Sequence, residues 1–208
     1  MGKSALVLGA TGVVGRELVR ELCESWGYDE VWAWARREIG FCHPKLRARI
    51  IDFEGISDIA QHKFDEIFCA LGTTMKQAGS REAFLRVDVD YVYAAAKWGK
   101  AAGVRRFALV SSPGANEGSP SFYLRAKGRI ERRVSELGFE DFQIAHLPLI
   151  LGEKPDAHPQ QQIAAMYLNC YLSLGKFGRL AAQVVSATSV IFGSKSYKNS
   201  LIFSLYFV

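Results

Sequence analysis

The sequence predicts an α/β fold in which helices cover both faces of a doubly wound parallel β-sheet. Three observations carry this prediction. Short apolar runs alternate with longer amphipathic runs, glycine or proline follows the last three apolar runs, and a glycine-rich turn follows the first. The expected strand order is 3-2-1-4-5-6, because right-handed crossovers extend such a sheet in both directions from its first strand. A chain of 208 residues has the length of a single domain.

The chain opens with a strand, a turn and a helix. The apolar run at 3–8 predicts the strand, and apolar residues at helical spacing predict the helix over 13–24. Between them, Gly9 permits a tight turn, Gly12 lets the backbone approach a pyrophosphate, and Gly15 lets the helix pack closely on the strand. This order is typical of dinucleotide-binding folds of the Rossmann type. The alternative is a glycine-rich turn that binds no ligand.

The start of this helix is predicted to bind the phosphates of a dinucleotide. Unpaired N–H groups and a partial positive charge at a helix N-terminus favour an anion. The residues expected to contact the cofactor here are Gly9, Thr11, Gly12, Val13, Val14 and Gly15.

Strands and helices then alternate along the chain. The predicted strands lie at 30–35, 49–51, 66–70, 106–111 and 142–147, and the predicted helices at 81–102 and 122–137. Gly103 and Gly138 end the two helices, and Pro148 ends the last strand. In such a sheet the ligand lies at the carboxyl ends of the strands, above strands one and four, where the strand order reverses.

The second and third strands end in residues suited to an adenosine group. Arg36 and Arg37 follow the second strand, where an NAD site usually has a carboxylate. Guanidinium groups match a 2′-phosphate, so we expect NADP rather than NAD; the alternative is two solvated arginines. Asp52 follows the third strand and is the expected contact of the adenine amino group.

The exits of the later strands supply the remaining predicted cofactor contacts. A glycine after the fourth strand lets the backbone lie against the cofactor, although the same glycine also suits a simple turn. The residues expected to contact the cofactor here are Leu71, Gly72, Thr73, Ser111 and Pro148.

The residues predicted to carry the chemistry follow the fifth strand. Ser111 and Ser112 end that strand, and Tyr123 and Lys127 share one face of the next helix because they are four residues apart. A phenol with a pKa near ~10 is a poor acid at neutral pH, but a nearby ammonium favours its phenolate form. We therefore expect Tyr123 to donate a proton, Lys127 to assist it and hold the nicotinamide ribose, and a serine to bond the substrate oxygen. The alternative is an incidental Tyr–Lys spacing.

These motifs resemble the short-chain dehydrogenase/reductase superfamily, especially its atypical members, whose glycine turn reads GxxGxxG. The stretches most similar to its Tat-interacting oxidoreductase-like group are residues 69–74, 87–92, 111–115 and 123–128. The resemblance extends to about residue 156 and implies an NADP-binding Rossmann domain with a Ser–Tyr–Lys catalytic set. By position it implies Ser112 as the substrate-polarising serine, with Ser111 as the competing choice. Family members often have an Arg-Pro pair where this chain has Leu147 and Pro148 after His146.

Composition and charge restrict the remaining classes. Neither the cysteines nor the histidines have the spacing of metal ligands, so no metal site is expected. Free thiols and the lack of a signal-peptide pattern predict a cytoplasmic protein. The net charge of +5 comes without a block of basic residues, so nucleic acid is not an expected partner. The closing apolar run at 200–208 is too short to span a bilayer, so stable membrane insertion is not expected.

The composition changes at about residue 156. Residues 157–208 contain no Asp or Glu and only the basic residues Lys176, Arg179, Lys195 and Lys198. The predicted organisation is therefore a dinucleotide-binding domain over 1–156 followed by an atypical segment over 157–208. That segment is either a divergent C-terminus or the product of a frameshift.

Three functions compete at this point. The first is an NADP(H)-dependent oxidoreductase acting on a small carbonyl or alcohol substrate. The second is an NADPH-binding regulatory protein that contacts a partner protein without turnover, and the third is a sugar-nucleotide epimerase or dehydratase. A homodimer formed through the helix at 81–102 and its successor is one predicted assembly, against the alternative that Tyr91, Tyr93 and Trp98 belong to the core.

Overall fold

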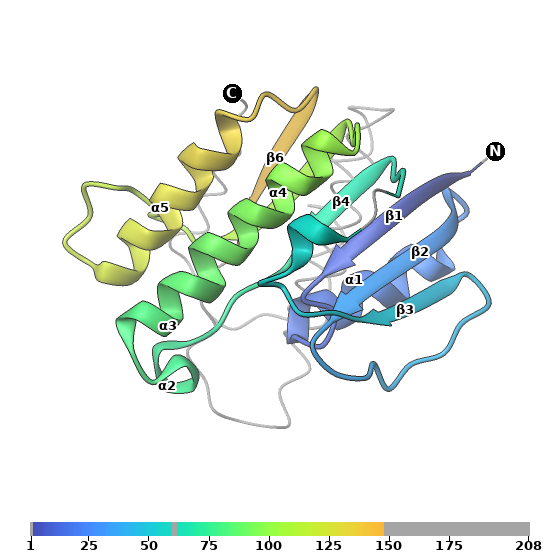
Figure 1. Ribbon diagram of the computed structural model, residues 1–208, viewed down its shortest axis with the longest axis horizontal. Helices are drawn as coiled ribbons and strands as arrows, with labels where there is room; N and C mark the ends of the chain where they lie inside the picture. Colours follow the sequence, from blue (N-terminus) through green and yellow to red (C-terminus); the bar gives the residue numbers. More distant parts are fainter. Residues whose placement is uncertain (1, 60–61, 148–208) are drawn as a thin grey trace, which may run out of the picture. The chain divides into compact units, whose positions relative to one another are not determined.

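A computed structural model of the chain describes residues 2–59 and 62–147. These residues form a six-stranded parallel sheet in the order β3-β2-β1-β4-β5-β6, which confirms the predicted fold class and strand order (Figure 1). The strands are β1 (Lys3–Leu8), β2 (Tyr28–Ala35), β3 (Leu46–Ile50), β4 (Glu66–Cys69), β5 (Arg106–Ser111) and β6 (Asp141–His146). Pro148 and the segment predicted over 157–208 lie outside the described residues.

Helices cover both faces of the sheet. Figure 1 shows α1 on one face and the run from α3 to α5 on the other. The helices are α1 (Val13–Glu24), the 3₁₀ turn η1 (Ile56–Asp58), α2 (Met75–Ala78), α3 (Arg81–Leu85), the π-helical segment η2 (Arg86–Tyr91), α4 (Val92–Ala101) and α5 (Phe122–Ser135).

The core lies around the central strands. Leu6, Leu8, Ile67, Phe107 and Leu109 come from β1, β4 and β5 and are at most 1% exposed. These strands are apolar on both faces, because helices cover each side of a doubly wound sheet. Their carboxyl ends are thereby held in fixed positions relative to one another.

Two predicted elements differ from the structure by more than one or two residues at their ends. The third strand was expected at 49–51 and lies at Leu46–Ile50, because β3 is an exposed edge strand in which two arginines interrupt the apolar residues. Its pairing with β2, rather than burial, fixes its position. The helix expected over 81–102 is divided by η2, and the short α2 before it was not predicted.

The aromatic side chains considered for a dimer face make contacts within the chain. Trp98 is 5% exposed, and its indole N–H donates to the Ile59 carbonyl at 3.0 Å, which places it in the core. The Tyr91 hydroxyl donates to Glu54 at 2.9 Å, and the Arg133 guanidinium lies 3.7 Å from the centre of the Tyr93 ring. A homodimer remains a prediction.

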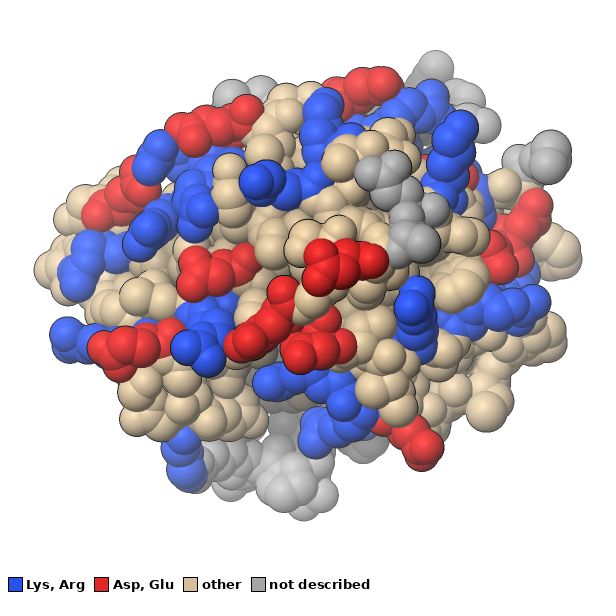
Figure 2. All heavy atoms as spheres, viewed as in Figure 1, with Lys and Arg blue, Asp and Glu red and all other residues tan. Residues whose placement is uncertain are grey.

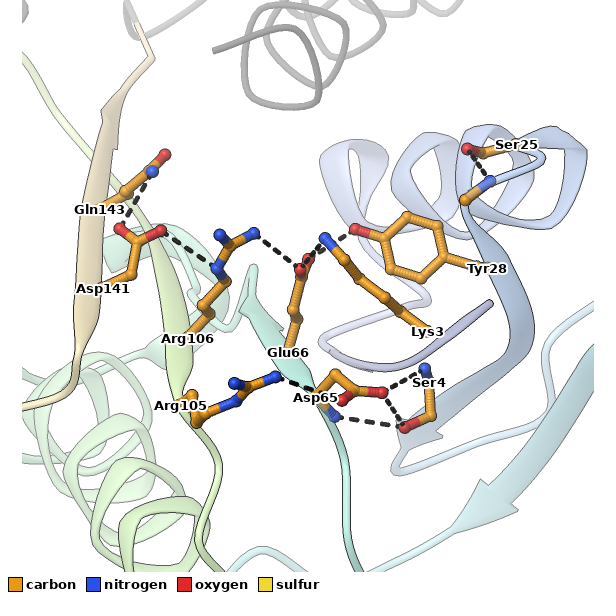
Figure 3. Close-up of polar contacts among 11 residues, drawn as sticks. Lys3, Ser4, Ser25, Tyr28, Asp65, Glu66, Arg105, Arg106, Asp141 and Gln143 are labelled. Carbon is orange, nitrogen blue, oxygen red and sulfur yellow. Dashed lines mark hydrogen bonds and ion pairs between the residues drawn. The ribbon is translucent and has the colours of Figure 1, made fainter. Parts of the chain in front are cut away.

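The first residues of five strands meet in one polar cluster at the amino edge of the sheet (Figure 3). Glu66, the first residue of β4, is 1% exposed. It accepts hydrogen bonds from Lys3 at 2.6 Å, Tyr28 at 2.5 Å and Arg106 at 3.1 Å. Arg106 also pairs with Asp141 of β6 at 3.3 Å. The cluster fixes the starting points of neighbouring strands on the edge away from the glycine turn.

Charges of both signs cover the face formed by α4 and α5. Figure 2 shows Lys and Arg interspersed with Asp and Glu there. Arg132, for example, pairs with Glu117 at 2.7 Å and with Glu136 at 2.6 Å. Within the part of the chain that the structure describes, no helix is long and apolar enough to cross a membrane.

Candidate functional site

The glycine turn after β1 is shaped by close backbone contacts. Gly9 has a φ of 80°, a left-handed conformation that favours glycine, and a Cβ there would lie 2.5 Å from the Ala70 carbonyl oxygen. A Cβ on Gly15 would lie 2.2 Å from the Gly9 carbonyl oxygen. The turn therefore packs against both the loop after β4 and the first turn of α1, as the roles predicted for Gly9 and Gly15 require.

The opening of α1 presents backbone groups at the carboxyl edge of the sheet. Gly12 is the N-cap residue, and no side chain caps the helix there. The first N–H groups of an α-helix have no partner within the helix, so an uncapped N-terminus is suited to an anion. Thr11, Val13 and Val14 flank this position, and Val13 is 54% exposed. Their contacts with a cofactor remain a prediction.

The predicted adenosine residues are exposed at the ends of β2 and β3. Arg36 and Arg37 directly follow β2, and both side chains are exposed. Asp52 is also exposed, and its carboxylate accepts the Glu54 backbone N–H at 3.0 Å. Since β2 and β3 are adjacent and parallel, the three side chains follow neighbouring strand ends.

Ser112 and Tyr123 are in direct contact. Their hydroxyl oxygens are 3.0 Å apart, and either group can be the donor. Ser121 caps the start of α5 and places Tyr123 in its first turn, while the Phe84 ring lies edge-on at 5.8 Å between ring centres. The Lys127 ammonium is 5.9 Å from the centre of the Tyr123 ring. The three residues predicted to be catalytic are therefore neighbours.

Ser111 has a different environment. Its hydroxyl donates to the Glu131 carboxylate, and the same carboxylate oxygen lies 2.9 Å from His146 Nε2. Ser111 is thus held by α5 and β6, whereas Ser112 contacts Tyr123. This geometry favours Ser112 over the competing choice.

A buried carboxylate that the sequence reasoning missed lies beside Lys127. Asp88, in η2, is 1% exposed, and its Oδ1 lies 2.8 Å from Lys127 Nζ. Its Oδ2 accepts the Thr73 backbone N–H at 2.8 Å. Burial raises the pKa of Asp88, and the attraction of Lys127 offsets only part of that effect. The sequence does contain one indication of this residue. Asp88 is an acid four positions from each of two apolar residues that are buried, Phe84 and Val92.

The loop after β4 reaches the same cluster. Leu71 is buried, Gly72 is exposed and Thr73 is half-buried. A Cβ on Gly72 would lie 3.3 Å from Asp88 Oδ1 and 3.7 Å from Lys127 Nζ. The glycine therefore lets the loop after β4 lie directly against the paired charges.

Gly128 is a second residue whose importance was missed. A Cβ there would lie 2.5 Å from the Asn116 carbonyl carbon and 2.6 Å from the Glu117 nitrogen. The Asn116 N–H also donates to the Leu124 carbonyl at 3.1 Å. The loop that follows Ser112 therefore packs directly on α5, which keeps the serine close to the tyrosine.

The site fits a nicotinamide dinucleotide. The glycine turn provides a cradle that a Cβ at Gly9 or Gly15 would disrupt, and the Ser112–Tyr123 pair follows a neighbouring part of the same sheet edge. Among the described residues, no group of three or more His, Cys, Asp or Glu side chains is arranged to hold a metal ion.

Comparison with known proteins identifies the family. The model of the NAD dependent epimerase/dehydratase family matches residues 5–127. The chain belongs to this family. Membership makes the chain an NAD(P)-dependent oxidoreductase by class, with a nicotinamide dinucleotide as its cofactor, and it agrees with the predicted resemblance to the short-chain dehydrogenase/reductase superfamily.

Two curated relatives extend the comparison beyond the matched residues. Rattus norvegicus protein HTATIP2 is 33% identical over 170 residues, which cover 79% of this chain and 70% of the relative. Protein FMP52, mitochondrial, of Meyerozyma guilliermondii is 38% identical over 162 residues, which cover 74% of this chain and 68% of the relative. The fungal names contradict the predicted cytoplasmic location. That prediction was wrong because free cysteines indicate a reducing environment without distinguishing one such compartment from another.

A solved structure with the same fold is MoeE5 in complex with UDP-glucose and NAD. It has a TM-score of 0.56 and 23% identity, and the match covers 70% of this chain. This chain spans 53% of MoeE5, or about half of its length. At 23% identity, the likeness to MoeE5 supports the fold of the present chain and says nothing of the substrate of this chain.

Proposed function

We propose that the chain is an NADP(H)-dependent oxidoreductase of the short-chain dehydrogenase/reductase type that acts on a small carbonyl or alcohol substrate. The observation that carries the proposal is the 3.0 Å contact between the Ser112 and Tyr123 hydroxyls, with Lys127 on the same face of α5. A hydroxyl pair of this kind can hold one substrate oxygen between two donors. Its place at the carboxyl edge, as in other dinucleotide folds, supports the assignment.

The residues divide the chemistry between them. A bound nicotinamide dinucleotide supplies or accepts the hydride. In the reductive direction, the Tyr123 hydroxyl donates its proton to the carbonyl oxygen, and the Ser112 hydroxyl donates a hydrogen bond that polarises that oxygen. Lys127 places a positive charge beside Tyr123, which favours the phenolate left after proton transfer. The oxidative direction uses the same groups in reverse order.

The preference for NADP over NAD rests on Arg36 and Arg37. Both are exposed directly after β2, where the ribose of the adenosine half lies in folds of this kind. Arginine binds phosphate through charge-assisted and often bidentate hydrogen bonds. We infer that one or both bind the 2′-phosphate.

Titration calorimetry of the full-length protein with NADPH and NADH tests the cofactor. We expect tighter binding of NADPH, and loss of that preference in Arg36→Ala. Arg105→Ala is the matched control, because it removes an equal charge from an exposed arginine that pairs with Asp65 at the opposite edge. Failure of both cofactors to bind, or a preference unchanged in Arg36→Ala, would contradict the proposal.

Substitution of Tyr123 distinguishes turnover from binding alone. With a panel of small aldehydes and ketones, Tyr123→Phe should lower kcat by about 100-fold to 10,000-fold while NADPH affinity stays nearly the same. Tyr93→Phe is the control, because Tyr93 contacts Arg133 outside the site. NADPH binding without turnover by the wild-type protein would instead favour the regulatory alternative.

A sugar-nucleotide epimerase or dehydratase is the second candidate, favoured by the family description. MoeE5, of which this chain spans about half, was solved with UDP-glucose and NAD, and these are the compounds to test first. Incubation with UDP-glucose and NAD, followed by NMR of the sugar, would show an epimer or a dehydrated product if this candidate holds.

A further inference from the structure

We propose that Asp88 is a positioning residue that keeps Lys127 charged and in place beside Tyr123 and ties that lysine to the loop after β4. The inference rests on the proposed function, because it assigns a partner to Lys127 in the same site. It adds a residue outside the predicted Ser–Tyr–Lys set.

The contacts of Asp88 use both carboxylate oxygens. Oδ1 pairs with Lys127 Nζ at 2.8 Å, and Oδ2 accepts the Thr73 N–H at 2.8 Å. One carboxylate thus joins α5, which carries Tyr123, to the loop that follows β4. A displacement of Asp88 would release both partners.

The pair is enclosed. Asp88 is 1% exposed and Lys127 is 6% exposed, so each charge depends on the other in place of water. Gly72 lies against them from the loop after β4, where a Cβ would approach Asp88 Oδ1 to 3.3 Å.

The other titratable groups near the pair do not replace Asp88. From β4, the thiol of Cys69 interacts electrostatically with both Lys127 and Asp88. Burial raises the pKa of this thiol to about 12, so it stays neutral at physiological pH. From α5, the Tyr123 hydroxyl is engaged in a hydrogen bond with Ser112. Among the described residues, Asp88 is the one acid paired with the Lys127 ammonium.

Asp88 lies in the π-helical segment η2. The segment Arg86–Tyr91 is π-helical within the run from α3 to α4. Such single-turn π segments are frequent at functional sites. Here Asp88 and Val89 are buried, whereas Asp90 and Arg86 are exposed.

Without the carboxylate, the Lys127 ammonium would be buried with no counter-charge. Burial then favours the neutral amine, which neither favours the phenolate nor donates as strongly to a ribose hydroxyl. Asp88 therefore acts on the reaction through Lys127 and does not touch the substrate.

Amine labelling of the full-length protein tests this role without a cofactor. Trace acetylation with acetic anhydride at about pH 8, followed by peptide mass spectrometry, measures how much of Lys127 is neutral. We expect Asp88→Asn to raise its labelling rate at least about tenfold, which corresponds to one unit of pKa. Asp90→Asn is the matched control, since Asp90 is an exposed acid two residues away. Equal rates in the two variants would overturn the proposal.

Asp88→Glu keeps the test decisive if Asp88→Asn does not fold. This variant retains the charge on a longer side chain, and we expect Lys127 labelling within about threefold of the wild-type rate, a difference under half a unit of pKa. Labelling about tenfold faster than wild type in Asp88→Glu, with the fold intact by circular dichroism, would also overturn the proposal.

NADPH binding separates this inference from the proposed function. For Asp88→Asn, we expect the dissociation constant for NADPH to rise about tenfold as the pH rises from about 6 to about 9. This rise should exceed any rise in the dissociation constant of Asp90→Asn over the same pH range. Faster labelling with no NADPH binding even by wild type would overturn the proposed function and leave the Asp88–Lys127 coupling. Binding by wild type with no effect of Asp88→Asn on labelling or affinity would overturn the coupling alone.

Discussion

At the scale of single residues, two adjacent serines have separate roles. Ser112 contacts Tyr123 at 3.0 Å, and Ser111 donates to Glu131. We predict that Ser112→Ala lowers kcat/KM by about 100-fold or more, as loss of a donor to a developing oxyanion does. Ser111→Ala should retain most of that activity and lower the free energy of unfolding by about 1 kcal/mol, the net value of one hydrogen bond. Steady-state kinetics and urea denaturation of both variants measure these effects.

A reversed pattern would contradict the assignment. If Ser111→Ala lost activity while Ser112→Ala kept it, Ser111 would be the polarising serine and the structure would have favoured the wrong neighbour.

Asp88 also links stability to pH. Burial raises the pKa of its carboxyl in the folded chain above the value in the unfolded chain. The folded state therefore binds more protons between the two values, and the contribution of this group to stability falls as pH rises through the folded pKa. Asp88→Asn lacks this group, so its deficit in the free energy of unfolding relative to wild type should shrink between about pH 4 and about pH 6. Urea denaturation at both pH values measures the difference, and a deficit that grows would contradict the prediction.

At the scale of elements, the packing of the serine loop on α5 depends on one glycine. A Cβ on Gly128 would meet backbone atoms of Asn116 and Glu117 at 2.5 and 2.6 Å. Backbone cannot move as a flexible side chain can, so Gly128→Ala should lower the free energy of unfolding by about 3 kcal/mol. The variant should also separate Ser112 from Tyr123 and lower activity.

Gly40→Ala is the control for that substitution. A Cβ on Gly40 would meet no atom within 4 Å. Its effect on the free energy of unfolding should stay below about 0.5 kcal/mol. Similar losses in both variants by urea denaturation would show that the contact at Gly128 is not decisive.

The elements also show how far the sequence could be interpreted. β1, α1 and β5 lie at the predicted residues, because buried strands and an amphipathic helix leave strong apolar patterns. β3 was misplaced because its apolar residues alternate with arginines on an exposed edge and form no continuous apolar run. The π-helical turn in η2 was not predicted, since it depends on packing that a periodicity of 3.6 residues does not encode.

In the candidate site, too, features with a local sequence pattern were predicted and features that depend on tertiary packing were missed. Motifs with fixed spacing, such as the glycine turn and the Tyr123–Lys127 pair, were found in the sequence, and the structure brings Ser112 to Tyr123. Asp88 was missed because its partner is 39 positions away, and only the assembled fold brings the two charges together. Gly128 was missed because the loop it accommodates is defined by tertiary packing.

At the scale of the whole molecule, Glu66 joins strands that are far apart in the sequence. Its carboxylate binds the first residues of β1, β2 and β5. Glu66→Gln should lower the free energy of unfolding by about 2–3 kcal/mol, below the ~3–5 kcal/mol of a fully buried pair, because Lys3 and Arg106 can partly reach water. Thermal and urea unfolding measure the loss.

Glu30→Gln is the control for the amino-edge cluster. Glu30 pairs with Arg47 at 3.8 Å on the exposed side of the sheet, and such pairs contribute less than about 1 kcal/mol. NADPH affinity should be unchanged in both variants, because the cluster lies at the edge opposite the site. Equal stability of the two variants would contradict a central role for Glu66.

The π-helical segment makes the site sensitive to chain length as well as to side-chain identity. Deleting one residue within 86–91 would allow one regular α-helix to run from α3 to α4. Each residue turns an α-helix by about 100°, so Phe84 and Val92, then seven positions apart, would still share the core side, whereas the residue lost would decide which side chain faces Lys127. A relative that has lost Asp88 in this way would keep the sheet and the glycine turn but would need another counter-charge for its lysine.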